Sequence, residues 1–385
     1  MEQYKKNKER HHSMYTDNYQ PAYDDLEKLE EACHELAATT PVTSYEHLMS
    51  IREQLKKLAL GETDTPLIMA GPCSEYVRLD ESPRTIAKGY NKLYEGIKNE
   101  HPHAIAVIRG CGQAAKPRSQ EMEDNLPSYY GDMINGEEKT LQSRRPDPSR
   151  MVATALQSRD IESYLSEWHG DHIAMAHEAL LLTYEKSFMK ELNNQHYIAS
   201  GDMLWIGDRT RKPDGEHVKL LTSILNPVGI KVGPNIEAHD VARLAQTLNP
   251  HNHPGKLSFI IRFGAEEIKN IGKLLDVIAE EAPNCLIVSD PCHGNTREVK
   301  NIHGIAQKTR VVEDMVTEIM SLSTLCRERN IRLHGLHLEA VAMGDHKKQC
   351  VDQKHHLPNT ISSVDPQLNL TQLRRVLKET RDYLL

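Results

Sequence analysis

Eight short apolar runs divide this chain, and each ends on or near a side chain that can bind an ion or transfer a proton. The runs have the length and β-branched content of buried strands, and stretches long enough for a helix separate most of them. Eight alternating strands and helices predict an α/β fold, the (β/α)8 or TIM barrel, with its active site at the carboxyl ends of the strands. In chain order the runs are LIMAGPC, AIAVIR, YIASGDMLWIGDR, IKVG, LSFIIR, LIVSDPCH, HGLHLE and TISSVD.

The 385 residues are enough for one barrel with extensions, and no linker-like stretch divides them. Apolar residues recur at three- and four-residue spacing over residues 21–60. We therefore expect residues 1–60 to form a tail and an N-terminal helical extension, and residues 61–385 to form the barrel. A long helical insertion is expected after the second strand, reaching about residue 195 and including a helix over HEALLLTYEKSFMKEL.

Composition excludes several classes of protein. The formal net charge of -8 argues against nonspecific binding to nucleic acid, which needs a basic surface. The first residues, MEQYKKNKERHHS, have no apolar core and predict neither a signal peptide nor a membrane anchor. The seven cysteines are scattered and form no CxxC pair, which is typical of a reduced, cytoplasmic protein.

Four potential metal ligands follow the first, sixth, seventh and eighth predicted strands: Cys73, His293, Glu339 and Asp365. The first and eighth strands are neighbours in a closed barrel, so all four side chains could converge. A thiolate, an imidazole and two carboxylates suit a divalent ion such as Mn²⁺, Fe²⁺, Co²⁺ or Zn²⁺. Any one of them could equally be a buried structural residue, but the four together favour a metal site.

A second set of strand-end residues is basic. Five cations near one barrel mouth would repel each other unless an anion neutralised them, and Arg and Lys bind phosphate and carboxylate groups. Arg118 and Ser119, in KPRS, could form a separate phosphate site, although spacing alone supports this less. The five basic residues are Arg109, Lys116, Arg209, Lys231 and Arg262.

Two carboxylates are candidates for proton transfer or for holding a water molecule. Asp208, in GDRTRKPDG, could position a water. Glu178, in AHEALLL, could act as an acid or base, but could equally be an ordinary carboxylate at a helix start.

These residues lie in segments that resemble the type II 3-deoxy-D-arabino-heptulosonate 7-phosphate (DAHP) synthases. The similar segments follow the family's order from about residue 20 to the end. They include AGPCSE, RGCGQAAKPRS, LPSYYGDMING, HEALLLTYE, WIGDRTRKPDGEHV, NPVGIKVGPN, IIRFG, SDPCHGNT, KTR, GLHLE and VDPQLN.

The resemblance implies an enzyme of the shikimate pathway that condenses phosphoenolpyruvate with erythrose 4-phosphate. It implies that Cys73, His293, Glu339 and Asp365 hold a divalent metal, for which we expect Mn²⁺, with Co²⁺ as another candidate. It assigns the five basic residues above to phosphoenolpyruvate, and Arg118 and Ser119 to the aldose phosphate. We expect Lys116 to deliver a proton to the new hydroxyl, and Glu178 or Asp208 to orient the attacking water. Family members commonly associate, so a homodimer or homotetramer is expected.

The chain also departs from the family pattern. Asp208 replaces a glutamate, Cys292 a methionine, and Tyr130 and Gln367 each replace an arginine. Loss of two arginines could change the acceptor, so another aldose phosphate or an amino-sugar stays open as an alternative. The short region between Ile161 and His177 is similar to that of compact members in secondary metabolism, and predicts weak or no inhibition by aromatic amino acids.

Two further alternatives remain at this point. One is another metal-dependent barrel enzyme acting on phosphorylated sugars, which would not need so basic a site. The other is a noncatalytic paralogue that binds phosphosugars. Loss of a metal ligand would favour the paralogue, and none of the four is lost.

Overall fold

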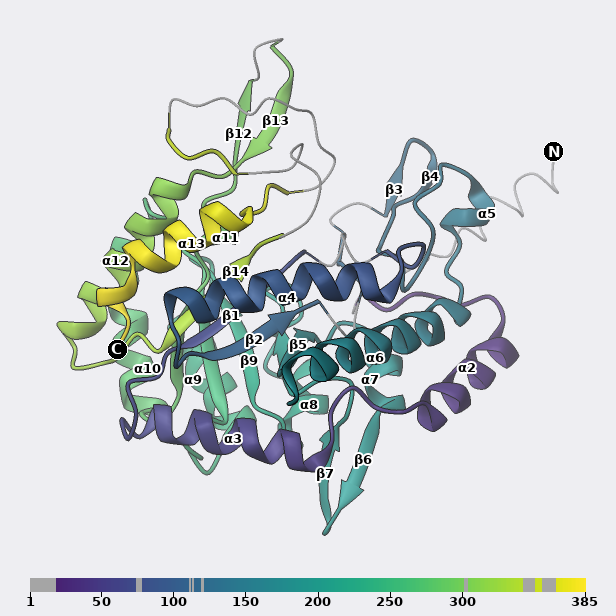
Figure 1. Ribbon diagram of the computed structural model, residues 1–385, viewed down its shortest axis with the longest axis horizontal. Helices are drawn as coiled ribbons and strands as arrows, with labels where there is room; N and C mark the ends of the chain where they lie inside the picture. Colours follow the sequence, from purple (N-terminus) through teal and green to yellow (C-terminus); the bar gives the residue numbers. More distant parts are fainter. Residues whose placement is uncertain are drawn as a thin grey trace.

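The structure is a computed structural model that describes residues 19–73, 78–110, 112, 114–118, 121–300, 304–341, 350–354 and 365–385. Eight parallel strands form a closed barrel, which confirms the predicted fold (Figure 1). In their order around the barrel, the strands are β1 (Leu67–Gly71), β14 (Gly335–Glu339), β11 (Leu286–Ser289), β10 (Leu257–Ile261), β9 (Val228–Val232), β8 (Met203–Ile206), β5 (Met175–Glu178) and β2 (Ile105–Arg109).

The prediction that TISSVD is the eighth strand was wrong. β14 pairs directly with β1, from Leu67 opposite Gly335 to Gly71 opposite Glu339, so the barrel closes without that run. Residues 360–364 of the run lie outside the described residues.

The strand that the sequence analysis missed is β5. It pairs with β2 and β8 inside the connection that was expected to continue to about residue 195. The predicted helix over HEALLLTYEKSFMKEL is instead the end of β5, a short helix α7 (Leu182–Ser187) and strand β6 (Met189–Leu192). β5 has only four residues, and the apolar ALLL that follows it resembles a helix start.

Helices surround the barrel, as expected of this fold. Two of them begin with well-known N-terminal capping residues. Ser82 caps α4, with Pro83 in its first turn, and Asn369 and Gln372 form a capping box at the start of α13. The helices are α4 (Pro83–Glu100), α5 (Leu141–Arg144), α6 (Ser149–His169), α8 (Glu216–Thr222), α9 (Ala238–Leu248), α10 (Gly272–Glu281), α11 (Pro291–Gly294), α12 (Val312–Arg327) and α13 (Leu370–Glu379), with 3-10 turns at Ile268–Asn270 and Arg381–Tyr383.

The N-terminal extension consists of α2 (Leu26–Ala38) and α3 (Tyr45–Ala59), which confirms its helical prediction. α3 buries Leu48, Ile51, Leu55 and Leu58, spaced along one face of the helix. These side chains share a core with the first residues of barrel strands, including Leu67, Ile105 and Leu286. The helix therefore closes the amino end of the barrel and leaves the carboxyl end for the site (Figure 1).

A buried charged cluster fastens this extension to the barrel. His172 lies between two carboxylates, with Nδ1 2.9 Å from Glu162 and Nε2 2.9 Å from Asp202. Thr43 of the extension donates a short hydrogen bond to Asp202, and the ring of His47 stacks on His172 at 3.9 Å. Because carboxylates only accept, both ring nitrogens of His172 must donate, which requires an imidazolium.

Three two-stranded hairpins extend from the barrel (Figure 1). They are β3–β4 (Met122–Glu123 and Leu126–Pro127), β6–β7 (Met189–Leu192 and Gln195–Ile198) and β12–β13 (Arg297–Lys300 and Ala306–Thr309). Among the described residues, no helix is both long and apolar enough to cross a bilayer.

Candidate active site

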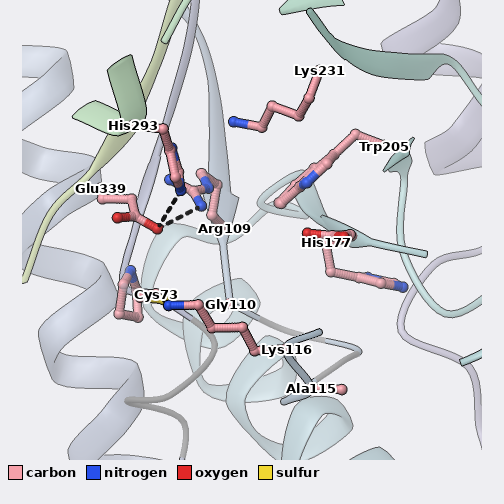
Figure 2. A pocket seen from close by; sticks show the side chains of 12 residues that line it. Cys73, Arg109, Gly110, Ala115, Lys116, His177, Trp205, Lys231, His293 and Glu339 are labelled. Atoms are coloured by element: carbon pink, nitrogen blue, oxygen red, sulfur yellow. Dashed lines mark hydrogen bonds and ion pairs between the residues drawn. The ribbon is translucent and has the colours of Figure 1, made fainter. Parts of the chain in front are cut away.

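A pocket opens at the carboxyl ends of the strands, with about 530 Å³ of empty space when the solvent at its mouth is included (Figure 2). Strand alternation directs its side chains inward: Glu339 faces the pocket, whereas Leu336 and Leu338 of the same strand join the core outside the barrel. The lining contains seven residues that the sequence analysis singled out: Cys73, Arg109, Lys116, Glu178, Lys231, His293 and Glu339. It also contains Pro72, Gly110, Ala115, His177 and Trp205.

The four predicted metal ligands are connected by one direct contact and by basic side chains that contact two of them at a time. Glu339 Oε1 is 3.2 Å from His293 Nε2 (Figure 2). Lys116 Nζ is 3.7 Å from Cys73 Sγ and 3.7 Å from Asp365 Oδ2. Within the part of the chain that the structure describes, no three such side chains surround a common point closely enough to hold an ion. In their chemistry, a thiol, an imidazole and two carboxylates fit a divalent cation, and the ammonium of Lys116 already lies beside two of them.

Arg310 links the two carboxylates of this set. Its side chain is fully buried, with Nη1 2.6 Å from Glu339 Oε2 and Nη2 3.4 Å from Asp365 Oδ2. Burial alone would raise the pKa of Glu339, but His293 and then Arg310 outweigh it and hold that pKa well below its usual value. Burial is likewise outweighed at Asp365, where Lys116, Arg310 and Lys308 lower the pKa to about 2. Both carboxylates are therefore ionised at neutral pH.

The predicted anion site divides into a buried part and a rim. Arg109 and Lys231 are buried, and their charged groups lie 5.2 and 6.0 Å from the centre of the Trp205 ring. Lys231 also forms an ion pair with the fully buried Asp290. Burial lowers the pKa of Lys231, and Asp290 opposes that shift.

The other two predicted phosphoenolpyruvate ligands are outside the pocket lining. Arg262 Nη1 donates to Asp208 Oδ2 at 3.0 Å, and the exposed Arg209 has Nη1 3.4 Å from the carbonyl oxygen of Pro117. Arg118, predicted for the aldose phosphate, donates through Nε to the carbonyl oxygen of Tyr129 at 2.7 Å. Ser119, its predicted partner, lies outside the described residues.

The two candidate carboxylates differ in their surroundings. Glu178 is the last residue of β5, so the alternative of a helix-start carboxylate was wrong. Burial raises the pKa of Glu178, while Lys231, His293 and Arg209 oppose the rise. A Cβ on Gly207 would lie 2.1 Å from Glu178 Oε1, so this glycine leaves space for the carboxylate. Asp208 instead pairs with Arg262 and Arg211.

Several residues of the site were not predicted. Asp290 accepts from His293 Nδ1 at 2.8 Å, which directs Nε2 of the same ring toward Glu339. His337 is fully buried in β14, with its ring edge-to-face against Trp205 at 4.8 Å. Strand alternation could have indicated His337, which lies two residues before the inward-facing Glu339. Arg310 follows no predicted strand, and only its place in the KTR segment of the family resemblance marked it.

Comparisons with known proteins agree with this architecture. The sequence model of the Class-II DAHP synthetase family matches residues 7–166 and 160–376. A phospho-2-dehydro-3-deoxyheptonate aldolase of Streptomyces coelicolor is 28% identical over 423 residues, covering 92% of this chain and 92% of the relative. A probable phospho-2-dehydro-3-deoxyheptonate aldolase of Pseudomonas fluorescens is 30% identical over 374 residues, covering 91% of each chain. A Neurospora crassa protein with the same name as the first is 27% identical over 437 residues, covering 91% of this chain and 89% of its own.

Proposed function

Because this chain belongs to the Class-II DAHP synthetase family, we propose that it condenses phosphoenolpyruvate with erythrose 4-phosphate to give DAHP and phosphate. One observation carries the proposal: the buried cations Arg109 and Lys231 face the same pocket as Cys73, His293 and Glu339. An anion cradle beside a set of metal-binding side chains suits a reaction between an anionic enol phosphate and a carbonyl compound.

We propose that Cys73, His293, Glu339 and Asp365 hold a divalent ion, for which Mn²⁺ is our first choice and Co²⁺ the second. Such an ion, when bound, supplies a Lewis acid for the aldehyde carbonyl. Asp290 and Arg310 support this role, because they fix the ring of His293 and the carboxylates of Glu339 and Asp365.

The remaining roles are carried by the chain's own residues. Arg109 and Lys231 bind phosphoenolpyruvate and neutralise its charge, with Arg209 and Arg262 at the rim. C3 of phosphoenolpyruvate attacks the aldehyde carbon, water adds at C2, and the tetrahedral intermediate expels phosphate by cleavage of the C–O bond. Lys116 supplies the proton to the new hydroxyl. Glu178 orients the water in preference to Asp208, because Glu178 lines the pocket whereas Asp208 is paired with two arginines.

The acceptor is the open part of this proposal. Tyr130 is buried, and Gln367 is fully buried with Oε1 accepting from the backbone N–H of Cys73 at 2.9 Å. Neither side chain supplies the positive charge of the arginine that the family has there, which favours testing a second aldose phosphate or an amino-sugar. We also propose that the enzyme is a cytoplasmic homo-oligomer, either dimer or tetramer, that serves secondary metabolism.

The deciding experiment measures phosphate release from phosphoenolpyruvate with Mn²⁺, with and without erythrose 4-phosphate, together with mass analysis of the product. We expect aldose-dependent release and a seven-carbon keto acid phosphate. Phosphate release that depends on a different aldose phosphate or on an amino-sugar would show that this compound, and not erythrose 4-phosphate, is the acceptor. Binding of phosphoenolpyruvate without turnover of any acceptor would contradict the proposal and support a noncatalytic phosphosugar-binding protein.

A further inference from the structure

A buried glutamate lies behind the site, outside the pocket lining. Glu318 of α12 is fully buried, and its Oε1 accepts hydrogen bonds from the backbone N–H groups of Phe263 and Gly264 at 3.0 and 2.9 Å. Its Oε2 accepts from Asn295 Nδ2 at 2.7 Å. Burial raises the pKa of Glu318 to about 8, although the hydrogen bonds from Gly264, Phe263 and Asn295 oppose that rise.

These donors belong to two different loops of the site. Phe263 directly follows Arg262 at the end of β10, and Asn295 follows His293 by two residues. Asn295 completes the connection, since its Oδ1 accepts from the backbone N–H of Ala265 at 2.9 Å. One carboxylate and one amide thus join the loop of a proposed phosphoenolpyruvate ligand to the loop of a proposed metal ligand.

The two loops also touch through glycines. A Cβ on Gly264 would lie 2.5 Å from the carbonyl oxygen of Gly294, and a Cβ on Gly294 would lie 2.3 Å from Gly264 N. Gly264 has φ +87°, a conformation that favours glycine. The two backbones therefore pack directly against each other, with no room for a side chain between them.

We propose that Glu318 and Asn295 are positioning residues that hold Arg262 and His293 as one rigid unit, so that the anion cradle and the metal ligands are aligned together. This inference rests on the proposed function for the roles of Arg262 and His293. Neither Glu318 nor Asn295 lines the pocket, so each acts only through its neighbours.

The test changes the donor and the acceptor of the hydrogen bond between Asn295 and Glu318. In Glu318→Gln, two N–H₂ groups face each other across this contact. In Asn295→Asp, two carboxyl groups face each other. The double variant restores one donor and one acceptor, although its aspartate loses the present bond from Asn295 Nδ2 to the carbonyl oxygen of Pro291. Glu328→Gln, an exposed change at the end of the same helix, is the matched control.

We would measure the KM for phosphoenolpyruvate, the Kd for Mn²⁺ of the metal-free protein, and hydrogen exchange at Phe263, Gly264 and Ala265. Each single change should raise KM and Kd about tenfold, as expected when a buried hydrogen-bonding group is left unsatisfied, and should speed exchange at these amides. The double variant should recover most of both constants, whereas a role limited to stability would lower Tm and leave them unchanged.

Unchanged KM and Kd in both single variants, or no recovery in the double variant, would overturn the inference. If the wild-type protein fails to turn over phosphoenolpyruvate, the proposed function fails. The Mn²⁺ titration and the exchange rates of the single variants then still decide whether the two loops are joined as we infer.

Discussion

The imidazolium of His172 makes a specific prediction about how stability depends on pH. Its contacts with Glu162 and Asp202 outweigh the cost of burial and raise its pKa to about 9, against 6.5 for an ordinary histidine. A group whose pKa is higher in the folded state adds stability that is fully present below the unfolded pKa. That contribution is lost as the pH rises through the folded pKa. The loss should therefore fall between about pH 6.5 and pH 9.

The size of the effect follows from the shift. A difference of roughly 2.5 pKa units corresponds to about 3 kcal/mol, and the side chain is 8% exposed, so solvent screening reduces this little. We would measure the free energy of unfolding in urea at pH 6.5 and pH 9.5 for the wild type and for His172→Gln. The advantage of the wild type should shrink by about 3 kcal/mol at the higher pH. His196→Gln, on the exposed β7 strand, should follow the wild type. Parallel pH profiles for the wild type and His172→Gln would refute the assignment of an imidazolium.

Three further predictions concern the site, and a fourth concerns regulation. Asp290→Asn leaves Lys231 buried without its carboxylate and should cost about 3–5 kcal/mol in urea unfolding; unchanged stability would contradict a charged pair. Gly207→Ala should push the Glu178 carboxylate away and lower kcat by about 100-fold, while a kcat equal to that of the wild type would remove Glu178 from the mechanism. Arg310→Lys keeps the charge but cannot bond Glu339 and Asp365 together, so Mn²⁺ affinity should fall about tenfold by calorimetry; wild-type affinity would show that the fork is dispensable. Phenylalanine, tyrosine and tryptophan at physiological levels should leave turnover unchanged, and strong inhibition by any of them would refute this.

The barrel strands could be predicted from the sequence wherever one short segment contains both an apolar run and the charged residue that ends it. Seven apolar runs are barrel strands, and some of the charged residues that end them, among them Arg109 and Glu339, line the pocket, whereas Arg209 and Arg262 do not. β5 was missed because its four residues are too short to show a period. TISSVD was chosen instead because its composition resembles a strand, but pairing between β1 and β14 leaves it no edge to join.

The residues that support the site were harder to find because their partners are distant in sequence. Arg310 meets Glu339 across 29 positions and Pro366 across 56, and nothing local marks it as buried. Glu318 looks like an ordinary helical carboxylate until the loops at Phe263 and Asn295 fold against it. Only the inward face of a strand is periodic, so residues that act from behind that face leave no sequence pattern.

The pairing of β1 with β14 also constrains how the chain can be made. Leu67 pairs with Gly335, which is synthesised much later. One edge of β1 therefore stays unpaired on the nascent chain until almost the whole sequence has been synthesised. The apolar face of α3 also stays partly uncovered during synthesis, because the residues that it packs against include Leu286 of the late strand β11. Contacts so far apart in sequence form slowly and expose aggregation-prone edges in the meantime. We therefore expect the cellular yield of this protein to depend on protection from aggregation during synthesis, and a truncation before residue 335 to leave the barrel open.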